Sequence, residues 1–287
     1  MKVFKYLSIL LVALLTVSCE KHEIEYNTEF ADGAFVQIHY FVPLKAATAN
    51  NIYKLEIGDN TYVNNSAAVI STYNGTPPAA SATARWYNVT SDTSVPIKLY
   101  MGTGMELVYN NAIPALKKGV KYNIFIHDFD KEPLVIEHGE YDYNTTEDSD
   151  EACWIKFINL VYETGEGDPT NLSIQYQFQY TTDVEAGTKS EWLDMGGPVA
   201  FGEDTGWIEM PVKKSIFNSS GYARIDYRAL DAATGEILQY MKKKKKMTNY
   251  SDYWNGYIGQ RFLHIMAGTR TATTRALAVS QWKALGN

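Results

Sequence analysis

Residues 34–43, AFVQIHYFVP, alternate between the two faces of an extended chain. Val36 and Ile38 point to one side, and Gln37 and His39 point to the other. A side-chain period of two residues is typical of a β-strand, because successive side chains leave opposite faces of a sheet. The segment therefore predicts a strand.

Short segments of the same kind follow along the first half of the chain. They cover residues 51–63, 67–72, 82–89, 94–102, 119–129 and 133–141. Clusters of Gly, Pro, Asn and Asp separate them, and these residues favour turns. The 21 tyrosines and the β-branched residues favour sheet over helix. About seven short strands with regular turns predict an all-β protein built as a β-sandwich.

A polar, acidic stretch interrupts the pattern at YNTTEDSDEA, residues 143–152. A segment of this composition cannot join a hydrophobic core without leaving charges unpaired. It predicts an acidic linker at 143–151, between a first sandwich domain at 32–142 and a second at 152–287.

The strand pattern of the first half recurs in the second. Four pairs of segments correspond: 34–43 with 153–163, 51–63 with 171–182, 119–129 with 257–268, and 133–141 with 275–282. Between them lie further apolar segments at 206–212, 222–231 and 235–247, and DAATGE, residues 231–236, predicts a hairpin turn. Internal similarity of this kind indicates gene duplication and two related sandwiches in series.

The N-terminal segment has the layout of a secretory signal. Lys2 and Lys5 precede an apolar run at residues 7–15, and this run is about half of the ~20 residues that a membrane-spanning helix needs. It predicts an export signal and not a membrane-spanning helix.

The end of this signal is marked by a cysteine. Val17, Ser18 and Cys19 resemble the lipobox of bacterial lipoproteins, in which the cysteine is acylated and becomes the mature N-terminus; Thr16 departs from the leucine usual there. We expect a signal peptide at 1–18 and a lipid, such as palmitate, on Cys19. The alternative is a cysteine buried in a core.

An acidic tether follows the cysteine at residues 19–31, with glutamates at 20, 23, 25 and 29. It resembles the export signal that sends Bacteroidetes lipoproteins to the outer face of the outer membrane. The alternative is that the acidic side chains only solvate a linker. We therefore expect a lipid-anchored protein of the outer membrane, exposed at the cell surface.

The charge of the mature chain limits its partners. Without residues 1–18 it has 24 Lys and Arg against 33 Asp and Glu, a net charge of −9. This balance speaks against nucleic acid, because phosphate contacts need clustered cations. With Cys19 acylated, Cys153 is the only free thiol, which leaves no intramolecular disulfide and no cysteine metal cluster.

The opening strand, the segment GVKYNIFIHDFDKEPLVI at 119–136 and the lipobox together resemble a known group of proteins. These are Bacteroidetes surface lipoproteins of unassigned function. The resemblance covers most of the mature chain and implies two immunoglobulin-like β-sandwich domains in tandem. It implies no catalytic residue, because the shared motifs are strand patterns.

Motifs of known catalytic sites are absent from the sequence. The five histidines form no H-E-x-x-H pair, and there is no G-x-S-x-G elbow, P-loop or dinucleotide fingerprint. His127, Asp128 and Asp130 lie close together in HDFDKE, but a calcium loop needs more oxygens at other spacings, which favours a solvated turn. Paired carboxylates that cleave glycosides stay open, because the fold sets their separation. We expect no enzyme, no metal and no cofactor.

Five consecutive lysines, Lys242, Lys243, Lys244, Lys245 and Lys246, form a strongly basic run. They are a candidate contact for an anionic partner, such as lipopolysaccharide phosphate or an acidic polysaccharide. The alternative, which we favour, is an edge strand or loop whose charge prevents pairing with other chains.

The segment SDYWNGY, residues 251–257, is the best candidate for an exposed aromatic cluster. Tyr253, Trp254 and Tyr257 are candidate ligand contacts there, because exposed aromatic rings can stack on sugar rings. Trp86, Trp192 and Trp207 also lie near turns or in polar surroundings. Most tryptophans of sandwiches nevertheless pack between sheets.

These observations predict a non-catalytic binding module for a glycan or a surface protein, held at the membrane by its lipid. The alternative from another class is a structural subunit or accessory of a surface assembly such as a fimbria, formed by strand addition at open sheet edges. A hydrolase ranks third.

Overall fold

The computed structural model describes residues 33–75, 86–139, 151–212, 214–242 and 246–283. The signal segment, Cys19, the tether, most of the acidic linker and Lys243, Lys244 and Lys245 lie outside these residues. Within the described ranges, no helix has the length and apolar character needed to cross a membrane.

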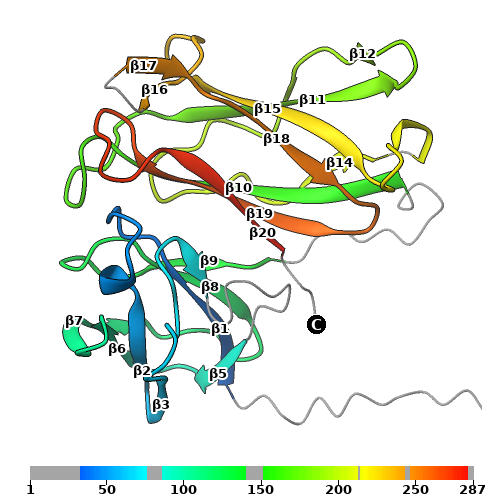
Figure 1. The fold of residues 1–287 in the computed structure, drawn as a ribbon. Coiled ribbons are helices and arrows are strands. Elements are labelled where there is room, and N and C mark those ends of the chain that lie inside the picture. Colours follow the sequence, from blue (N-terminus) through cyan, green and yellow to red (C-terminus); the bar gives the residue numbers. More distant parts are fainter. Residues whose placement is uncertain (1–32, 76–85, 140–150, 213, 243–245, 284–287) are drawn as a thin grey trace, which may run out of the picture. The chain divides into compact units, whose positions relative to one another are not determined.

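The all-β prediction is confirmed. Apart from two 3₁₀ turns at Thr48–Asn50 and Lys214–Ile216, every regular element of the described chain is a strand. The strands form two sandwiches, each with its own hydrophobic core (Figure 1). The domain boundaries given above stay a prediction.

The first sandwich consists of two sheets. One sheet has the order β4-β1-β8-β9, with β5 also paired to β1: β4 Asn74–Gly75, β1 Gly33–Tyr40, β8 Lys121–Ile126, β9 Leu134–Glu137 and β5 Tyr87–Thr90. The other has the order β3-β2-β6-β7: β3 Asn60–Val63, β2 Ile52–Ile57, β6 Val95–Met101 and β7 Glu106–Ile113. Alternate side chains such as Val36, Ile38, Leu55 and Leu99 fill the core between them.

The second sandwich repeats this plan. One sheet has the order β14-β10-β19-β20: β14 Ile208–Pro211, β10 Ala152–Tyr162, β19 Arg261–Thr269 and β20 Ala278–Lys283. The other has the order β12-β11-β15-β18, with β13 also paired to β11: β12 Thr188–Lys189, β11 Ile174–Asp183, β15 Ala223–Asp231, β18 Ser251–Gly256 and β13 Leu193–Asp194. A hairpin of β16 Gln239–Lys242 and β17 Lys246–Asn249 is inserted between β15 and β18.

The two sandwiches share one topology. In each, the first strand pairs in parallel with the next-to-last strand, β1 with β8 and β10 with β19. In each, that first strand also pairs antiparallel with a middle strand, β5 or β14. The other sheets match strand for strand, β2-β6-β7 with β11-β15-β18. The internal repeat seen in the sequence is therefore present in the strand order.

This strand order differs in detail from that of an immunoglobulin domain. With the eight main strands of the first sandwich lettered A to H, omitting the two-residue β4, the sheets run D-A-G-H and C-B-E-F. Immunoglobulin constant domains run A-B-E-D and C-F-G. The architecture is the predicted sandwich, but both sheets are paired differently. The first strand, for example, occupies the interior of its sheet beside a parallel neighbour.

Three segments of the first half differ from their prediction. Residues 51–63 form the hairpin β2–β3 and not one strand, because the chain turns at Gly58, whose φ is 53°. Residues 67–72 form no strand and contribute only the bridge of Ile70 to Ile52. The strand β7 was not predicted, because its edge position leaves its side chains half exposed and its alternation weak.

The two sandwiches contact each other through the outer faces of the sheets that contain β1 and β10. Phe41 and Phe125 of the first sandwich pack in one apolar cluster with Ile158, Leu160 and Leu263 of the second. This contact explains the sequence of β10, which is buried along its whole length. A strand covered on both faces carries a nearly continuous apolar run.

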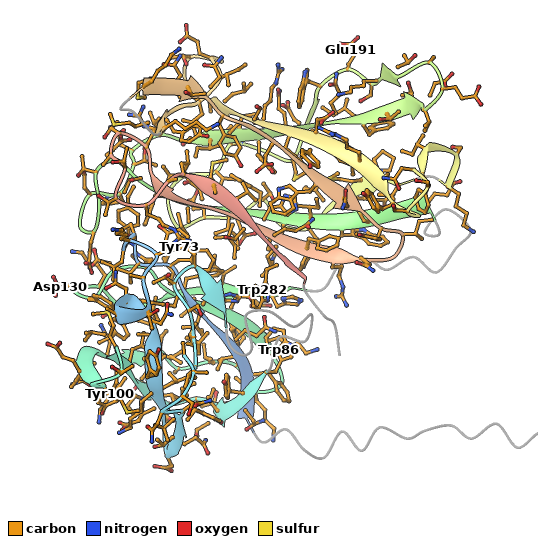
Figure 2. All side chains as sticks on the ribbon, viewed as in Figure 1. Tyr73, Trp86, Tyr100, Asp130, Glu191 and Trp282 are labelled. Atoms are coloured by element: carbon orange, nitrogen blue, oxygen red, sulfur yellow. The ribbon has the colours of Figure 1, made fainter. Side chains whose placement is uncertain are left out.

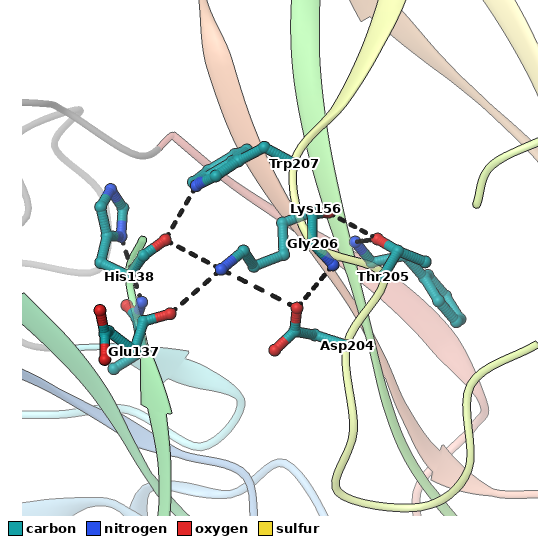
Figure 3. A network of polar contacts seen from close by, with 9 residues as sticks. Glu137, His138, Lys156, Asp204, Thr205, Gly206 and Trp207 are labelled. Carbon is teal, nitrogen blue, oxygen red and sulfur yellow. Dashed lines mark hydrogen bonds and ion pairs between the residues drawn. The ribbon is translucent and has the colours of Figure 1, made fainter. Parts of the chain in front are cut away.

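Lys156 is the charged residue of β10, and only 4% of it is exposed. Its ammonium donates hydrogen bonds to the carbonyls of Glu137 (3.1 Å) and His138 (2.8 Å) in the first sandwich, and Asp204 lies 3.8 Å away (Figure 3). The indole of Trp207 donates to the same His138 carbonyl at 2.8 Å. Burial lowers the pKa of Lys156, and Asp204 opposes that shift. These bonds fix the second sandwich to the end of β9.

Buried histidines make the stability pH-dependent. Burial lowers the pKa of His39 to about 4 and those of His138 and His264 to about 3. The unfolded chain therefore binds protons below pH 6.5 that the folded chain does not bind. We expect the free energy of unfolding to change little between about pH 7 and pH 8 and to fall below 6.5, by about 1.4 kcal/mol per pH unit for each histidine.

Urea unfolding at pH 7.5, 6.5 and 5.5 checks this, in a range where most carboxylates stay ionised. The His39→Gln variant should show a shallower fall than the wild type. A free energy of unfolding that stays constant down to pH 5.5 would contradict the burial of neutral histidines.

Candidate binding face

The outer face of the β12-β11-β15-β18 sheet carries aromatic and charged side chains that contact one another, and Tyr253 is the predicted contact among them. Alternation in β11 and β15 produces it: Tyr176 and Tyr227 point into the core, and their neighbours point outward. We call this set the binding face. Its members are Gln177, Gln179, Lys189, Trp192, Asp194, Arg224, Asp226, Arg228 and Tyr253.

One half of the binding face is organised around Tyr253. The guanidinium of Arg224 lies over the Tyr253 ring, 3.8 Å from its centroid. Arg224 Nε also contacts Asp226 Oδ1 at 3.1 Å, and Lys189 pairs with the other oxygen of the same carboxylate. The side chains are thereby held in place, while 51% of Tyr253 stays exposed.

The other half is organised around Trp192. The guanidinium of Arg228 lies 4.4 Å from the centroid of the indole, and its Nε donates to Gln177 Oε1 at 2.7 Å. Gln177 Nε2 in turn donates to Asp194 Oδ1 at 2.7 Å. Each ring is thus flanked by a guanidinium that also makes a hydrogen bond to a neighbouring side chain, which fixes its orientation and lowers the entropy cost of binding a ligand.

Such a face can bind a flat polar molecule. An aromatic ring covers an apolar surface, such as the C–H face of a sugar, and the surrounding amides, guanidinium groups and carboxylates bind hydroxyl groups at its rim.

The predicted aromatic contacts fall on different surfaces. Tyr253 lies on the binding face, and Trp254 lies on the opposite side of β18, packed against the second core and 5.8 Å from His264. Tyr257 follows β18 and packs against Tyr222, with 5.6 Å between ring centroids. Adjacent residues of a strand point to opposite faces, so Tyr253 and Trp254 do not form one contact surface.

The basic run belongs to another element. Lys242 and Lys246 are exposed Cα partners at the end of the β16–β17 hairpin, which forms a two-stranded sheet of its own. The three lysines between them lie outside the described residues. The hairpin and the binding face are thus parts of separate sheets.

Sequence reasoning missed the arginines of the binding face. The segment ARIDYR, residues 223–228, alternates Arg224, Asp226 and Arg228 with apolar residues, and this signal marks a polar outer face. The stacking of Arg224 on Tyr253 depends on the register of β15 with β18, in which Asp226 is the Cα partner of Tyr253. The sequences of two segments this far apart do not reveal which of their residues pair.

The first sandwich has a related but smaller arrangement on its own outer face. Lys54 lies over the ring of Tyr100, 4.3 Å from its centroid, and pairs with Glu56 at 2.6 Å. Lys98 pairs with the same carboxylate at 3.3 Å. As in the second sandwich, a cation stacks on a tyrosine and shares its carboxylate with a second cation. Tyr100, which is labelled in Figure 2, is therefore a matched control for Tyr253.

The acidic turn HDFDKE has a structural role. Asp128 Oδ1 accepts a hydrogen bond from the amide of Asp130 (2.8 Å), and its Oδ2 accepts one from Gly167 (3.1 Å). Glu166 accepts from the amide of Phe129 at 2.6 Å. These bonds tie the β8–β9 loop to the β10–β11 loop. The described residues contain no group of three histidine, cysteine or carboxylate side chains arranged to hold a metal ion.

The chain was compared with known proteins. No family model matches it, and no curated protein matches it. Among solved structures, a candidate cell adhesion protein from Bacteroides fragilis NCTC 9343 aligns over 88% of this chain and 98% of its own, with 9% identity and a TM-score of 0.21. A similarity at this level carries no argument about fold or function.

Proposed function

We propose that the protein is a non-catalytic binding module of the bacterial cell surface, which recognises a glycan through the binding face of its second sandwich. Its lipid anchor on Cys19 and its acidic tether hold the two sandwiches at the outer membrane. The proposed location at the outer membrane rests on the sequence of the N-terminal segment.

The observation that carries the glycan proposal is the pair of supported rings. Tyr253 and Trp192 are each flanked by an arginine, and the arginines are held by Asp226 and Gln177. Tyr253 is 51% exposed and Trp192 is half-buried. A ring whose orientation is already fixed loses little conformational entropy when it binds. Sugars offer the matching surface, with C–H groups on one face and hydroxyls around the edge.

Affinity gel electrophoresis tests the proposal. The mature chain with Cys19→Ala is run through native gels that contain a neutral α-glucan, a β-glucan, a mannan or a pectin. We expect at least one polysaccharide to retard it, and the Tyr253→Ala variant to bind about tenfold more weakly, as expected for a contact worth about 1.4 kcal/mol.

Tyr100→Ala is the control, because it removes a similar ring from the first sandwich and should leave the retardation unchanged. The proposal fails if no polysaccharide retards the wild type. It also fails if the Tyr100 and Tyr253 variants lose binding equally.

A protein partner on the same face is the second candidate. Arginine, tyrosine and tryptophan are the residue types that dominate hot spots of protein interfaces, and Leu193 beside Trp192 is 40% exposed. A stoichiometric protein that co-purifies from detergent-solubilised membranes with the wild type, and not with Tyr253→Ala, would favour this candidate over the glycan.

A further inference from the structure

Four polar side chains lie buried on the outer face of the sheet that contains β1, where it meets the second sandwich. Gln37 is 1% exposed, His39 and Asn123 are 0% exposed, and His138 is 4% exposed. Gln37 and Asn123 are Cα partners in the β1–β8 ladder, and His39 is two residues further along β1. We call this set the polar row.

Hydrogen bonds define which atoms of the polar row carry protons. Asn123 Oδ1 lies 3.0 Å from His39 Nε2, and Asn123 Nδ2 lies 3.2 Å from His138 Nδ1. An amide oxygen only accepts and an amide nitrogen only donates, so with this amide orientation His39 is protonated on Nε2 and His138 accepts on Nδ1. Neutral His39 then offers an acceptor at Nδ1, and neutral His138 offers a donor at Nε2.

Those remaining atoms have no partner. Both amide atoms of Gln37, His39 Nδ1 and His138 Nε2 are buried without a hydrogen bond in the part of the chain that the structure describes. The same holds for two indole nitrogens, Nε1 of Trp86 and Nε1 of Trp282.

The two tryptophans belong to the same cluster as the polar row. The Trp86 ring meets His138 edge-on, with 5.3 Å between centroids, and the Trp282 ring meets His39 edge-on, with 5.7 Å between centroids. Figure 2 labels both tryptophans. Trp282 lies on β20 of the second sandwich, so the cluster spans the contact between the sandwiches.

Buried polar atoms without hydrogen-bond partners are costly, so these atoms need a bound water molecule or ligand. Each buried donor or acceptor without a partner loses the free energy of its hydration, and several together would cancel much of the net stability of a folded protein. In native proteins such groups are satisfied by ordered water or by a ligand.

We propose that the polar row and the two indoles form a binding site for small uncharged molecules that carry hydroxyl groups, occupied by ordered water in the unliganded protein. A hydroxyl both donates and accepts. Several hydroxyl groups share these partners: some accept from Gln37 Nε2, His138 Nε2 and the indoles, and others donate to His39 Nδ1 and Gln37 Oε1. A fully ionised anion cannot supply the donors that the last two atoms need.

This site is separate from the binding face and does not depend on the glycan proposal. Its occupant would connect β1 and β9 of the first sandwich to β20 of the second. It complements the bonds of Lys156 to Glu137 and His138, which join the same two bodies.

Crystallography distinguishes water from other hydroxyl compounds. Crystals of the mature chain are grown without polyols, and a second set is soaked in glycerol. We expect ordered oxygen atoms within hydrogen-bond distance of the Gln37 amide and His39 Nδ1 in both sets. Glycerol oxygens at these atoms after the soak support the site, and water alone in both sets overturns the proposal of a ligand site. No ordered density at these atoms in either set overturns it.

NMR provides a test in solution. Magnetisation transfer from water should reach the indole protons of Trp86 and Trp282 through occupant molecules that exchange with bulk water. Trp207 is the control, because its indole donates directly to the His138 carbonyl at 2.8 Å.

The Gln37→Leu variant should reduce the water signals of Trp86 and Trp282 and leave that of Trp207 unchanged. If the cluster is dry, these signals are absent in the wild type and Gln37→Leu raises the Tm, because it removes two unsatisfied atoms. That pair of results would overturn the proposal.

Discussion

Replacement of Cys19 by alanine is expected to move the protein from the membrane fraction to the soluble fraction of a Bacteroidetes host. The thiol of Cys19 is the proposed site of acylation, and an acyl group adds about 0.8 kcal/mol of membrane affinity per buried CH₂. Two or three chains therefore hold a protein almost completely at the membrane, so the effect is close to all or none. Fractionation and immunoblotting measure it.

Cys153→Ala is the matched control for this prediction. Cys153 is fully buried in the second core, where burial raises its pKa to about 12, so it is protected from acylation. The variant should stay in the membrane fraction and still incorporate an alkyne-labelled fatty acid. A Cys19→Ala protein that remains in the membrane and still takes up the label would contradict the lipid assignment.

Tyr176→Ala is expected to lower the free energy of unfolding by about 3–5 kcal/mol, the range for loss of a large buried aromatic side chain. Tyr176 is fully buried at the centre of the second core. Its ring stacks on Phe157, 4.3 Å away between centroids, and on Tyr227 at 5.2 Å. The truncation removes the middle ring of this stack and leaves a cavity between the two sheets.

Tyr176→Phe separates packing from hydrogen bonding. It keeps the ring stack and removes only the hydroxyl, which lies 3.2 Å from His264 Nδ1. We expect this variant to cost about 1 kcal/mol. Denaturant unfolding compares the two variants, and equal losses would show that the hydrogen bond, and not the stack, stabilises the core.

The strands of the second sandwich were the most predictable part of the fold. The segments at 153–163, 171–182 and 222–231 alternate clearly or are apolar throughout, and they correspond to β10, β11 and β15. Alternation is strong there because each strand faces a core on at least one side. The short strands β12 and β13 have two residues each, too few to show any period.

The binding face was predictable only in part. Tyr253 was predicted as a candidate contact from its polar surroundings, and strand parity separates it from Trp254 once residues 251–256 are recognised as β18. The supporting arginines come from β15, and their contacts with Tyr253 and Trp192 are set by pairing between distant segments. The tertiary fold sets this pairing, so neither segment predicts it alone.

The polar row shows how tertiary burial overrides a local pattern. In residues 34–43 the face with Gln37 and His39 would ordinarily be exposed to solvent, because it is the more polar of the two. The second sandwich covers that face, and both residues become buried. Nothing within the strand itself indicates this second layer of contact.

The glycan-binding role is tested most directly by a crystal structure of the mature chain with an oligosaccharide taken from the polysaccharide that retards it. We predict a sugar ring against the exposed side of Tyr253, with hydroxyl groups bonded to Arg224, Arg228 or Gln177. An oligosaccharide bound elsewhere, with Tyr253 and Trp192 left free, would contradict the account.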